Sequence, residues 1–352
     1  MGRHALPGRR RSRVGGRRAA GALTIAVLLT AGAAAVTQGW ADAAHMSLES
    51  LDGAPPAQSI LKAAPVERSG PSKAEQRRTA LARAAELKAK RQKAERLAAR
   101  RAAPTTTFRV ASINALGDSH TRAGGNKPGY ASGPARVHGL LGLLAAHQVD
   151  VVGLQEFEIP QRATFNHLAG AWDVFTGTER GHDSIAYRTD VWEYVTGGTG
   201  TIPYFRGNPA PLPWVTLLHR DTGREVSFIS VHNPTSNAQR GNNAAFRAEA
   251  TRREIALVRD LAQNGNPVVL VGDFNERSEA FCMVTGGGDI GAANGGSVGG
   301  SCAPPPQAGI DWIFGTTDVD FSEYVRQQGG LVARTTDHPV VVASATVTTP
   351  LP

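Results

Sequence analysis

Short apolar runs recur through residues 105–352, and they restrict the fold of this chain more than any other feature. Residues 108–114 alternate apolar and polar side chains, whereas residues 149–155 and 267–272 are mostly apolar throughout. Alternation is typical of a strand with one face on a core, and a short continuous apolar run is typical of a strand buried on both faces. We therefore expect a core built from strands.

Helical segments separate some of these strands, which indicates an α/β fold. Residues 134–147 are expected to form a short amphipathic helix and residues 243–264 a longer one. Further strands are expected at residues 183–188, 192–195, 216–219, 226–231, 310–314 and 339–347. An Asp-Thr-Gly turn at 221–223 predicts an antiparallel hairpin between two of them. Mixed connectivity with many strands predicts two packed mixed β-sheets flanked by helices.

The formal net charge of +8 lies almost entirely at one end of the chain. Residues 1–104 hold 20 Lys and Arg against 7 Asp and Glu, whereas residues 105–352 hold 18 against 23. The expected globular domain, residues 105–352, is therefore acidic. Its overall charge is no evidence that it binds the phosphate backbone of a nucleic acid.

The first 43 residues have the pattern of an export signal. Seven arginines lie between Arg3 and Arg18, an apolar run covers residues 22–36, and Ala-Asp-Ala follows at 41–43. As a helix, the apolar run would span about 22 Å, which is less than the roughly 30 Å hydrocarbon core of a bilayer. We expect residues 1–43 to be a cleaved signal peptide, and the mature protein to be secreted or associated with the cell envelope, without a stable membrane span.

Two segments separate the signal from the domain. Residues 44–71 are rich in Ala, Pro and Ser and are expected to be a disordered linker. Residues 72–104 are expected to be a basic helical stalk, because Ser72 and Glu75 have capping-box spacing and Pro104 ends the run. Its 11 basic and 3 acidic residues are consistent with a solvated spacer, or with binding to an anionic polymer such as cell-envelope phosphate or DNA.

The chain contains two cysteines, Cys282 and Cys302. Neither belongs to a Cys-x-x-Cys or Cys/His cluster, so a metal site is disfavoured. In an exported chain an isolated pair more often forms a disulfide. We expect that bond here, closing a glycine-rich loop.

Polar residues stand where the expected strands end or begin. They are Asn114, Glu156, His232, Asp273, Asn275, Asp311, Asp337 and His338. Catalytic and binding groups commonly project from such positions, where a rigid sheet fixes their geometry. Each residue alone also has a structural explanation as a turn or cap residue, so their joint order along the chain carries the argument.

That order resembles the endonuclease/exonuclease/phosphatase superfamily, whose fold is like that of deoxyribonuclease I. The matching motifs are Ser-Ile-Asn at 112–114, Gln-Glu at 155–156, His-Asn at 232–233, Gly-Asp-Phe-Asn at 272–275, Ile-Asp at 310–311 and Asp-His at 337–338. The resemblance implies an α/β four-layer sandwich with the active site on one rim of the paired sheets. It also implies hydrolysis of phosphate esters with a divalent metal.

The resemblance assigns three residues to the metal. Glu156 would be the chief ligand, with Asn114 beside it and Asp337 on the opposite side of the site. Sparse oxygen ligands suit Mg²⁺, with Mn²⁺ or Ca²⁺ as alternatives. The absence of a His/Cys cluster disfavours zinc.

The resemblance assigns five further residues to catalysis. Asp273 would orient the attacking water, and Asn275 would donate its amide to a phosphate oxygen. His338, held by Asp311, would act as an acid-base and phosphate-contact pair, because a carboxylate favours the imidazolium. His232 would be a second phosphate-facing histidine or the general acid.

The substrate stays open at this point. The first hypothesis is a secreted, Mg²⁺-dependent nuclease or related phosphodiesterase, for which DNA is one candidate. Glu158 weakens the DNase interpretation, because its carboxylate would repel a DNA phosphate. The second hypothesis is a sphingomyelinase-like enzyme acting on a phospholipid or another small phosphoester. The third is a noncatalytic envelope-binding protein. In each case we expect a monomer.

Overall fold

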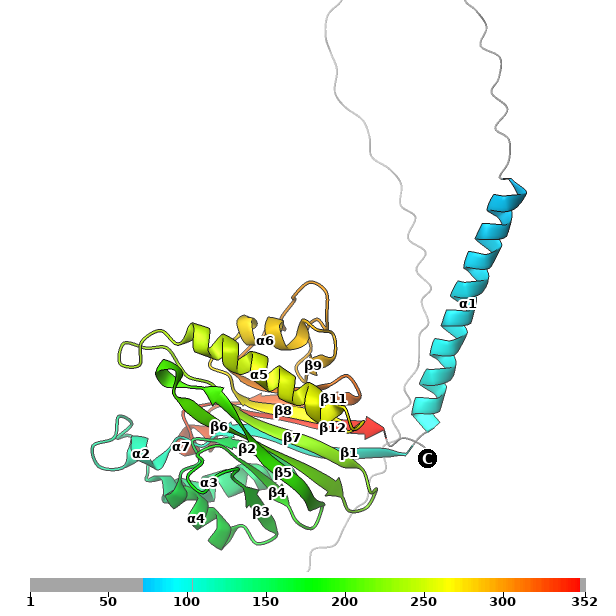
Figure 1. The fold of residues 1–352 in the computed structure, drawn as a ribbon. Coiled ribbons are helices and arrows are strands. Elements are labelled where there is room, and N and C mark those ends of the chain that lie inside the picture. The colour runs from blue at the N-terminus through cyan, green and yellow to red at the C-terminus, as the bar shows by residue number, and fades with distance from the viewer. Residues whose placement is uncertain (1–71, 103, 349–352) are drawn as a thin grey trace, which may run out of the picture. The chain divides into compact units, whose positions relative to one another are not determined.

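The computed structural model describes residues 72–102 and 104–348 (Figure 1). The expected signal peptide, residues 1–43, and the expected linker, residues 44–71, lie outside this range. Within the described ranges, no helix is both long enough and apolar enough to cross a membrane.

Helix α1 (Lys73–Ala102) occupies the expected basic segment. The Ser72 amide donates to Glu75 Oε2 at 2.7 Å, and the Glu75 amide donates to Ser72 Oγ at 3.3 Å, so the helix begins with the capping box that the sequence indicates. Every described side chain between residues 72 and 93 is exposed. Helix α1 therefore has no apolar face in this stretch, and its stability comes from local terms such as the Lys90–Glu86 pair at 2.7 Å.

Twelve strands form two six-stranded sheets in residues 104–348. The first has the order β11-β12-β1-β2-β4-β3 and the second the order β5-β6-β7-β8-β10-β9. The first comprises β1 (Thr105–Asn114), β2 (Val151–Gln155), β3 (Trp172–Phe175), β4 (Ser184–Arg188), β11 (Val319–Gln327) and β12 (Val340–Thr348). The second comprises β5 (Trp192–Pro203), β6 (Pro209–His219), β7 (Glu225–His232), β8 (Val268–Asp273), β9 (Ile290–Ala292) and β10 (Asp311–Thr316).

Each sheet contains one parallel pair among antiparallel neighbours. Strands β1 and β2 run parallel in the first sheet, and β7 and β8 run parallel in the second. The expected hairpin is present between β6 and β7, with Leu218 opposite Glu225. Both sheets are therefore mixed, as the sequence predicts.

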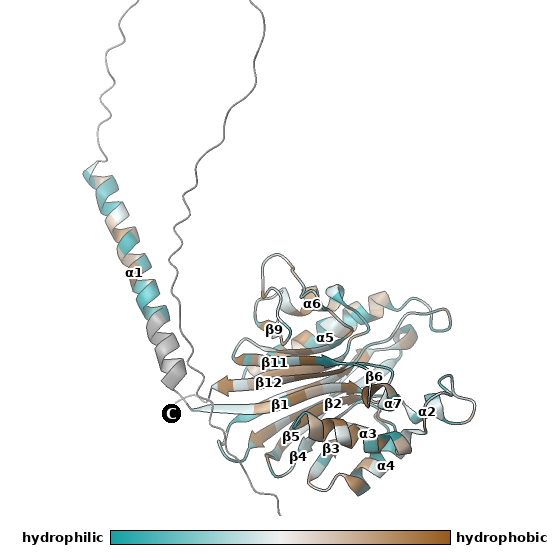
Figure 2. Ribbon diagram, turned by 180° about the vertical axis from the view of Figure 1, so that it is seen from behind, coloured by the Kyte–Doolittle hydropathy of each residue, from teal (hydrophilic) through white to brown (hydrophobic). Residues whose placement is uncertain are grey.

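Helices cover the outer face of each sheet (Figure 1). The first sheet is covered by α3 (Gly133–Ala146), α4 (Ile159–Leu168) and the short α7 (Val332–Thr335). The second is covered by α5 (Ala244–Ala262) and α6 (Ser278–Thr285). Figure 2 shows the apolar residues concentrated along the strands. The predicted α/β sandwich of two mixed sheets flanked by helices is thus confirmed.

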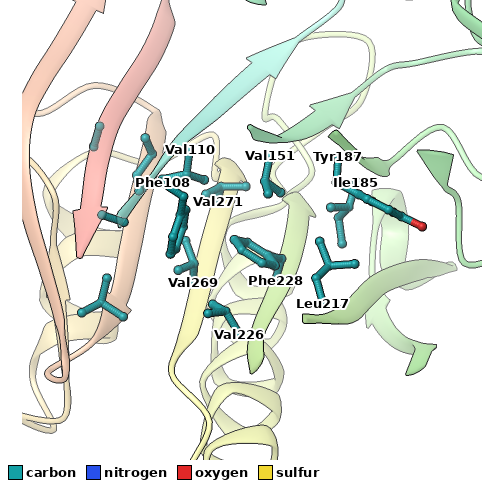
Figure 3. Packing of buried hydrophobic residues seen from close by; sticks show 14 of the residues in the cluster. Phe108, Val110, Val151, Ile185, Tyr187, Leu217, Val226, Phe228, Val269 and Val271 are labelled. Carbon is teal, nitrogen blue, oxygen red and sulfur yellow. The ribbon is translucent and has the colours of Figure 1, made fainter. Parts of the chain in front are cut away.

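The two sheets pack through a continuous apolar layer (Figure 3). Phe108, Val110 and Val151 of the first sheet contribute to the same cluster as Phe228 and Val269 of the second. The Phe108 and Phe228 ring centroids lie 5.7 Å apart at an interplanar angle of 73°. Such edge-to-face contacts add to the burial of apolar area, and they fix how one sheet lies on the other.

A glycine allows the sheets to approach closely near one rim. A Cβ atom added at Gly153 of β2 would lie 2.3 Å from Val271 Cγ2 of β8, so no other residue fits here unless Val271 or a strand shifts. Beside it, Gln155 Nε2 donates to Ser230 Oγ at 3.1 Å across the interface. The sheets are therefore joined by a polar contact directly below the strand ends that carry the motif residues.

Some strands are longer than the sequence indicates, and others are additional. Strands β5 and β6 also include residues 196–203 and 209–215, which lie outside the expected strands. Residues 209–213 pair with β5 but not with β7. Proline has no backbone N–H to donate, and it is tolerated here because one side of this segment forms no strand pairing. Strands β3, β9 and β11, the short helix α2 (Asp118–Thr121) and helices α4, α6 and α7 were not expected either.

The two cysteines of the chain are bonded in the structure. Cys282 lies on α6 and Cys302 in the loop before β10, with 5.3 Å between their Cα atoms. The bond closes the glycine-rich loop as the sequence analysis expects.

Candidate active site

The carboxyl ends of the two parallel strand pairs bring the motif residues together. Asn114 at the end of β1 lies opposite Gln155 at the end of β2. His232 at the end of β7 lies opposite Asp273 at the end of β8. The Asn114 Nδ2 atom donates to Asp273 Oδ2 at 3.2 Å, so the two sheets meet at a single polar site.

Glu156 is held by several donors in the turn after β2. Its backbone has a φ of 54°, in the left-handed region that non-glycine residues rarely adopt. Asn114 Nδ2 donates to Oε1 at 3.2 Å, and the Gly117 amide donates to Oε2 at 3.0 Å. Burial raises the pKa of Glu156, but His232, the Gly117 amide and His120 outweigh that effect and hold it below its ordinary value. Glu156 is therefore an ionised carboxylate at neutral pH.

Asp273, His338 and Asp311 form a second group. Asp311 Oδ1 lies 2.9 Å from His338 Nδ1, and Asp273 Oδ2 lies 3.7 Å from His338 Nε2. Burial lowers the pKa of His338, but the hydrogen bond and charge of Asp311 and the charge of Asp273 raise it to about 10. Burial and the Asp311 charge raise the pKa of Asp273 to about 6. The imidazolium thus lies between two carboxylates, since Asp311 binds it through Oδ1 and Asp273 lines the cavity.

His232 faces the same centre from β7. Its Nδ1 lies 3.6 Å from Asp183 Oδ1, and its Nε2 lies 3.7 Å from Asp273 Oδ2. Burial lowers the pKa of His232, whereas Asp183, Asp273 and Glu156 raise it to about 9. Both site histidines are therefore cationic at neutral pH.

Asn275 has a backbone that few side chains adopt, with a φ of 52°. Its amide donates to Asp273 Oδ1 at 2.9 Å, and its Nδ2 donates to the carbonyl of Asn233 at 2.8 Å. One hydrogen of the Nδ2 group remains for a ligand. The turn after β8 thus fixes Asp273 and Asn275 relative to each other.

Asp337 and Thr336 lie in the segment before β12. Asp337 Oδ2 forms an ion pair of 2.9 Å with Lys127 Nζ, which raises the pKa of the lysine through a hydrogen bond and its charge. Thr336 Oγ1 donates to the carbonyl of Asn114 at 2.6 Å and accepts from the His338 amide at 3.1 Å. Thr336, which the sequence analysis did not select, thereby ties β1 to the loop that carries His338.

The eight residues selected from the sequence lie around one cavity of about 750 Å³. Six of them line it, namely Glu156, His232, Asp273, Asn275, Asp337 and His338. The other two, Asn114 and Asp311, are 1% and 2% exposed and contact the lining residues from behind. Residues from all parts of the domain sequence therefore share a single cleft.

Several lining residues were not selected from the sequence. Asp183 lines the cavity, and its Oδ1 lies 3.6 Å from His232 Nδ1. His120, Lys127, Tyr204 and Arg240 belong to no motif and also line the cavity. They stand on connections whose course depends on the packing of the whole domain, so their spacing in the sequence carries no signal.

The side chains present fit a hard divalent cation. Glu156 is ionised, and Asp337 offers a second carboxylate on the cavity wall. The Asn114 oxygen accepts from the Leu116 amide at 3.0 Å, so in this arrangement Asn114 orients Glu156 through its nitrogen. Ligand atoms of Asp273, Asp311 and His338 also lie within 4.8 Å of one another, but the His338–Asp311 hydrogen bond already occupies two of them. One or two carboxylate oxygens and open positions for water are typical of Mg²⁺.

Comparisons with known proteins agree with this arrangement. A family model described as "Endonuclease/Exonuclease/phosphatase family" matches residues 111–338, which is more than half of the chain. A comparison with curated proteins finds no match.

Several solved structures have a similar fold with TM-scores above 0.5, and three of them illustrate the likeness. A Bacteroides thetaiotaomicron protein of the same family is 18% identical, with a TM-score of 0.53 over 69% of this chain and 99% of that one. A mannosyl-6-phosphatase of the same organism is 19% identical, with a TM-score of 0.51 over 68% and 99%. The catalytic domain of human Nocturnin, with a bound sulfate anion, is 16% identical, with a TM-score of 0.51 over 71% and 99%. At these identities the likeness shows a common fold.

Proposed function

The chain belongs to the endonuclease/exonuclease/phosphatase family, a family of phosphoester hydrolases, and from that premise we propose that it is a cation-dependent phosphodiesterase acting on nucleic acid. The resemblance inferred from the motifs is thereby confirmed. The reaction, the cation and the substrate assigned below belong to the proposal.

One observation carries the proposal. Contacts run without a gap from Asp311 through His338, Asp273 and Asn114 to Glu156, across both sheets. This arrangement places two cationic histidines and two carboxylates of unlike pKa on one cavity. A phosphodiester needs its negative oxygens neutralised, a water deprotonated and a leaving oxygen protonated, and these groups supply each requirement.

Asp273 is the group that would take the proton from the attacking water. A pKa of about 6 leaves it mostly ionised at neutral pH, yet a stronger base than an exposed aspartate. The Asn275 amide and Asn114 Nδ2 bind its two oxygens, so its orientation is fixed. Asn275 would donate its remaining N–H to a phosphate oxygen.

The two histidines would act on the phosphate and on the leaving group. His338, fixed by Asp311, presents Nε2–H toward the cavity and would bind a phosphate oxygen. His232 approaches from the other side, with Asp183 on Nδ1 and Nε2 directed toward Asp273 and Glu156. A proton on His232 Nε2 would therefore be available to the departing oxygen.

Glu156 and Asp337 are the residues that would hold the cation, and Asn114 would orient Glu156. We propose Mg²⁺, with Mn²⁺ or Ca²⁺ as alternatives, because the donors are hard oxygens. When bound, such an ion neutralises phosphate oxygens and stabilises the charge that develops in the transition state.

A second candidate is hydrolysis of a phospholipid or another small phosphoester. Glu158 favours it, because its carboxylate lines the cavity and accepts from the Ser119 amide at 2.9 Å, where it would oppose a DNA backbone. A noncatalytic envelope-binding role is disfavoured, because every motif residue is present and six of the eight line one cavity.

The location of the protein also belongs to the proposal. The sequence of residues 1–43 and the bonded pair Cys282–Cys302 support export, because disulfides persist in oxidising compartments. Helix α1 would then connect the enzyme to an anionic envelope polymer, or act as a spacer. We further propose that the enzyme acts as a monomer.

Hydrolysis of bis(p-nitrophenyl) phosphate tests the proposal. The purified protein should release p-nitrophenol with Mg²⁺, and excess EDTA should abolish turnover. Asp273→Asn and His338→Gln should each lose at least about 100-fold in kcat/KM, as expected when a positioned proton-transfer group is removed. Asp260→Asn, a change at an exposed aspartate of α5, should keep wild-type activity. Turnover that resists EDTA, or full activity of Asp273→Asn, would refute the mechanism.

A further inference from the structure

One wall of the cavity is made of flat side chains that continue outward from the catalytic groups. The Tyr204 and His232 ring centroids lie 5.6 Å apart, and the Tyr204 and Phe205 centroids 4.3 Å apart. The Arg240 guanidinium carbon lies 4.5 Å from the Phe205 centroid. All four side chains line the same cavity. The wall therefore extends from His232 through Tyr204 and Phe205 to Arg240.

The wall is built from two loops that a buried asparagine holds together. Asn243 is 1% exposed, and its Oδ1 accepts from the Arg206 amide at 3.1 Å. Its Nδ2 donates to the carbonyls of Thr235 at 2.9 Å and Arg240 at 3.2 Å. Arg206, which follows Phe205 and donates its amide to Asn243, has a φ of 58°. The turn that carries Phe205 is therefore held in a conformation that non-glycine residues rarely adopt. This wall is therefore an ordered surface.

Arg240 has a charge that the protein itself does not neutralise. In the part of the chain that the structure describes, its guanidinium forms no ion pair and lies instead over Phe205. By contrast, Lys127, another cation that lines the cavity, is paired with Asp337. A guanidinium stacked on a ring offers a further flat, cationic face to a ligand.

Flat faces beside a phosphate site match one class of ligand. Nucleobases stack on aromatic rings and on guanidinium planes whenever they are not already stacked in a duplex. The domain is acidic overall, so attraction to a long phosphate backbone is weak, and stacking supplies affinity that does not depend on net charge. We propose that Tyr204, Phe205 and Arg240 form a stacking subsite for an unpaired nucleobase adjacent to the scissile phosphate. This inference rests on the proposed phosphodiesterase function.

The same wall is poorly suited to a choline phospholipid. A choline headgroup binds aromatic faces through its positive charge, but here Arg240 places a like charge over Phe205. An inositol or sugar headgroup would need hydrogen-bond donors and acceptors in place of ring faces. The substrate favoured by this surface is therefore single-stranded nucleic acid.

A pair of matched substrates tests the subsite. We would compare kcat/KM for a dinucleoside monophosphate with the values for the two analogues that each lack one base. The wild-type protein should prefer the complete dinucleotide over at least one analogue by about fivefold or more, the lower end of what one stacked base contributes. Phe205→Leu and Arg240→Met should reduce that preference toward 1, mainly through KM.

Three variants separate stacking from other effects. Arg240→Lys keeps the charge and loses the plane, so it should recover little of the preference. Tyr194→Leu and Arg220→Met change an exposed ring and an exposed cation outside the cavity and should keep the wild-type preference.

The outcomes distinguish this inference from the proposed function. Equal kcat/KM for the complete dinucleotide and both analogues would overturn the subsite and leave the phosphodiesterase intact. Full recovery in Arg240→Lys would also overturn it, because Arg240 would then act as a charge. Preferred hydrolysis of sphingomyelin vesicles would overturn the nucleic-acid assignment. Failure to hydrolyse any diester with Mg²⁺, Mn²⁺ or Ca²⁺, bis(p-nitrophenyl) phosphate included, would refute the proposed function itself.

Discussion

Asp311 Oδ1 lies 2.9 Å from His338 Nδ1, and this contact joins the first residue of β10 in one sheet to the loop before β12 in the other. Asp311 is 2% exposed, so its charge acts on the imidazole with little screening by water. The pair fixes the histidine's ring orientation and places its free nitrogen toward Asp273. The pKa of His338 is therefore raised in part by a residue that does not line the cavity.

We predict that Asp311→Asn loses at least about 100-fold in kcat/KM, because the imidazolium loses the charge that stabilises it. Without that charge the pKa of His338 falls, and the activity should decline at a lower pH than in the wild type. Rates across a pH series measure both effects. The exposed Asp260→Asn variant is the control, and an unchanged pH profile in Asp311→Asn would contradict the role.

The wild-type kcat/KM should follow a bell-shaped dependence on pH. Asp273 must be deprotonated to accept a proton, so the rate should rise as pH increases through about 6. His232 must be protonated to donate one, so the rate should fall as pH increases through about 9. Initial rates with a small diester at saturating cation provide the test. A rate that keeps rising beyond pH 10 would exclude His232 as the general acid.

Cation binding should depend on Glu156. Glu156→Gln removes the ionised oxygens at nearly constant shape, and we expect the Mg²⁺ concentration for half-maximal activity to rise at least about tenfold. Titration calorimetry with Mg²⁺ alone should show the same weakening, independent of turnover. Glu193→Gln, at an exposed glutamate of β5, is the matched control. Equal Mg²⁺ affinity of Glu156→Gln and wild type would place the cation elsewhere.

Glu254 should make the fold less stable at alkaline pH. It is fully buried on α5, and burial raises its pKa to about 8, against 4.5 in the unfolded chain. Between these values the folded chain keeps a proton that the unfolded chain loses, so the free energy of unfolding falls as pH rises through this window. Glu254→Gln should abolish this dependence and exceed the wild-type stability at pH 9 by on the order of 5 kcal/mol, since each unit of difference in pKa is worth about 1.4 kcal/mol.

Denaturant unfolding at pH 5 and pH 9 measures this difference. Glu249→Gln changes a solvent-accessible glutamate on the same helix and should leave the pH dependence as in the wild type. If the free energy of unfolding changes equally between pH 5 and pH 9 in wild type and Glu254→Gln, then Glu254 is ionised in the folded protein.

Deletion of residues 44–103 should spare the hydrolysis of a small diester, because the groups to which we assign catalysis all lie in residues 105–348. Rates with bis(p-nitrophenyl) phosphate and with single-stranded DNA separate the two roles of α1. If α1 binds polyanions, the DNA rate falls while the small-diester rate persists, and the loss increases at low salt. Unchanged DNA cleavage would favour a spacer.

The sequence predicted the parts of the fold that local patterns determine. The buried strands at β1, β2 and β8, the hairpin between β6 and β7, and the capping box at Ser72 each depend on residues close together in the chain. Strand β3 was missed because its residues are only partly buried and follow no clear alternation. The extension of β6 depends on which neighbour it pairs with, and no local pattern shows that.

The candidate site was predicted to a similar extent. Motif residues at strand ends were found because a sheet edge gathers such positions. Thr336 was missed as a positioning residue, since its hydrogen bond to the Asn114 carbonyl joins residues 222 positions apart. Tyr204, Phe205 and Arg240 come from two loops whose meeting depends on Asn243, a residue that resembles an ordinary helix cap in the sequence.

Gly153 has a consequence beyond its own strand. Glu156 belongs to the half of the domain that carries β2, and Asp273 to the half that carries β8, with Gly153 and Val271 in contact between them. An alanine at position 153 would bring its Cβ within 2.3 Å of Val271 Cγ2, so Val271 or one of the two strands would have to shift just below Glu156 and Asp273. The missing side chain at position 153 thus allows the two sheets to pack closely beneath Glu156 and Asp273, and it helps to keep these two carboxylates at one site.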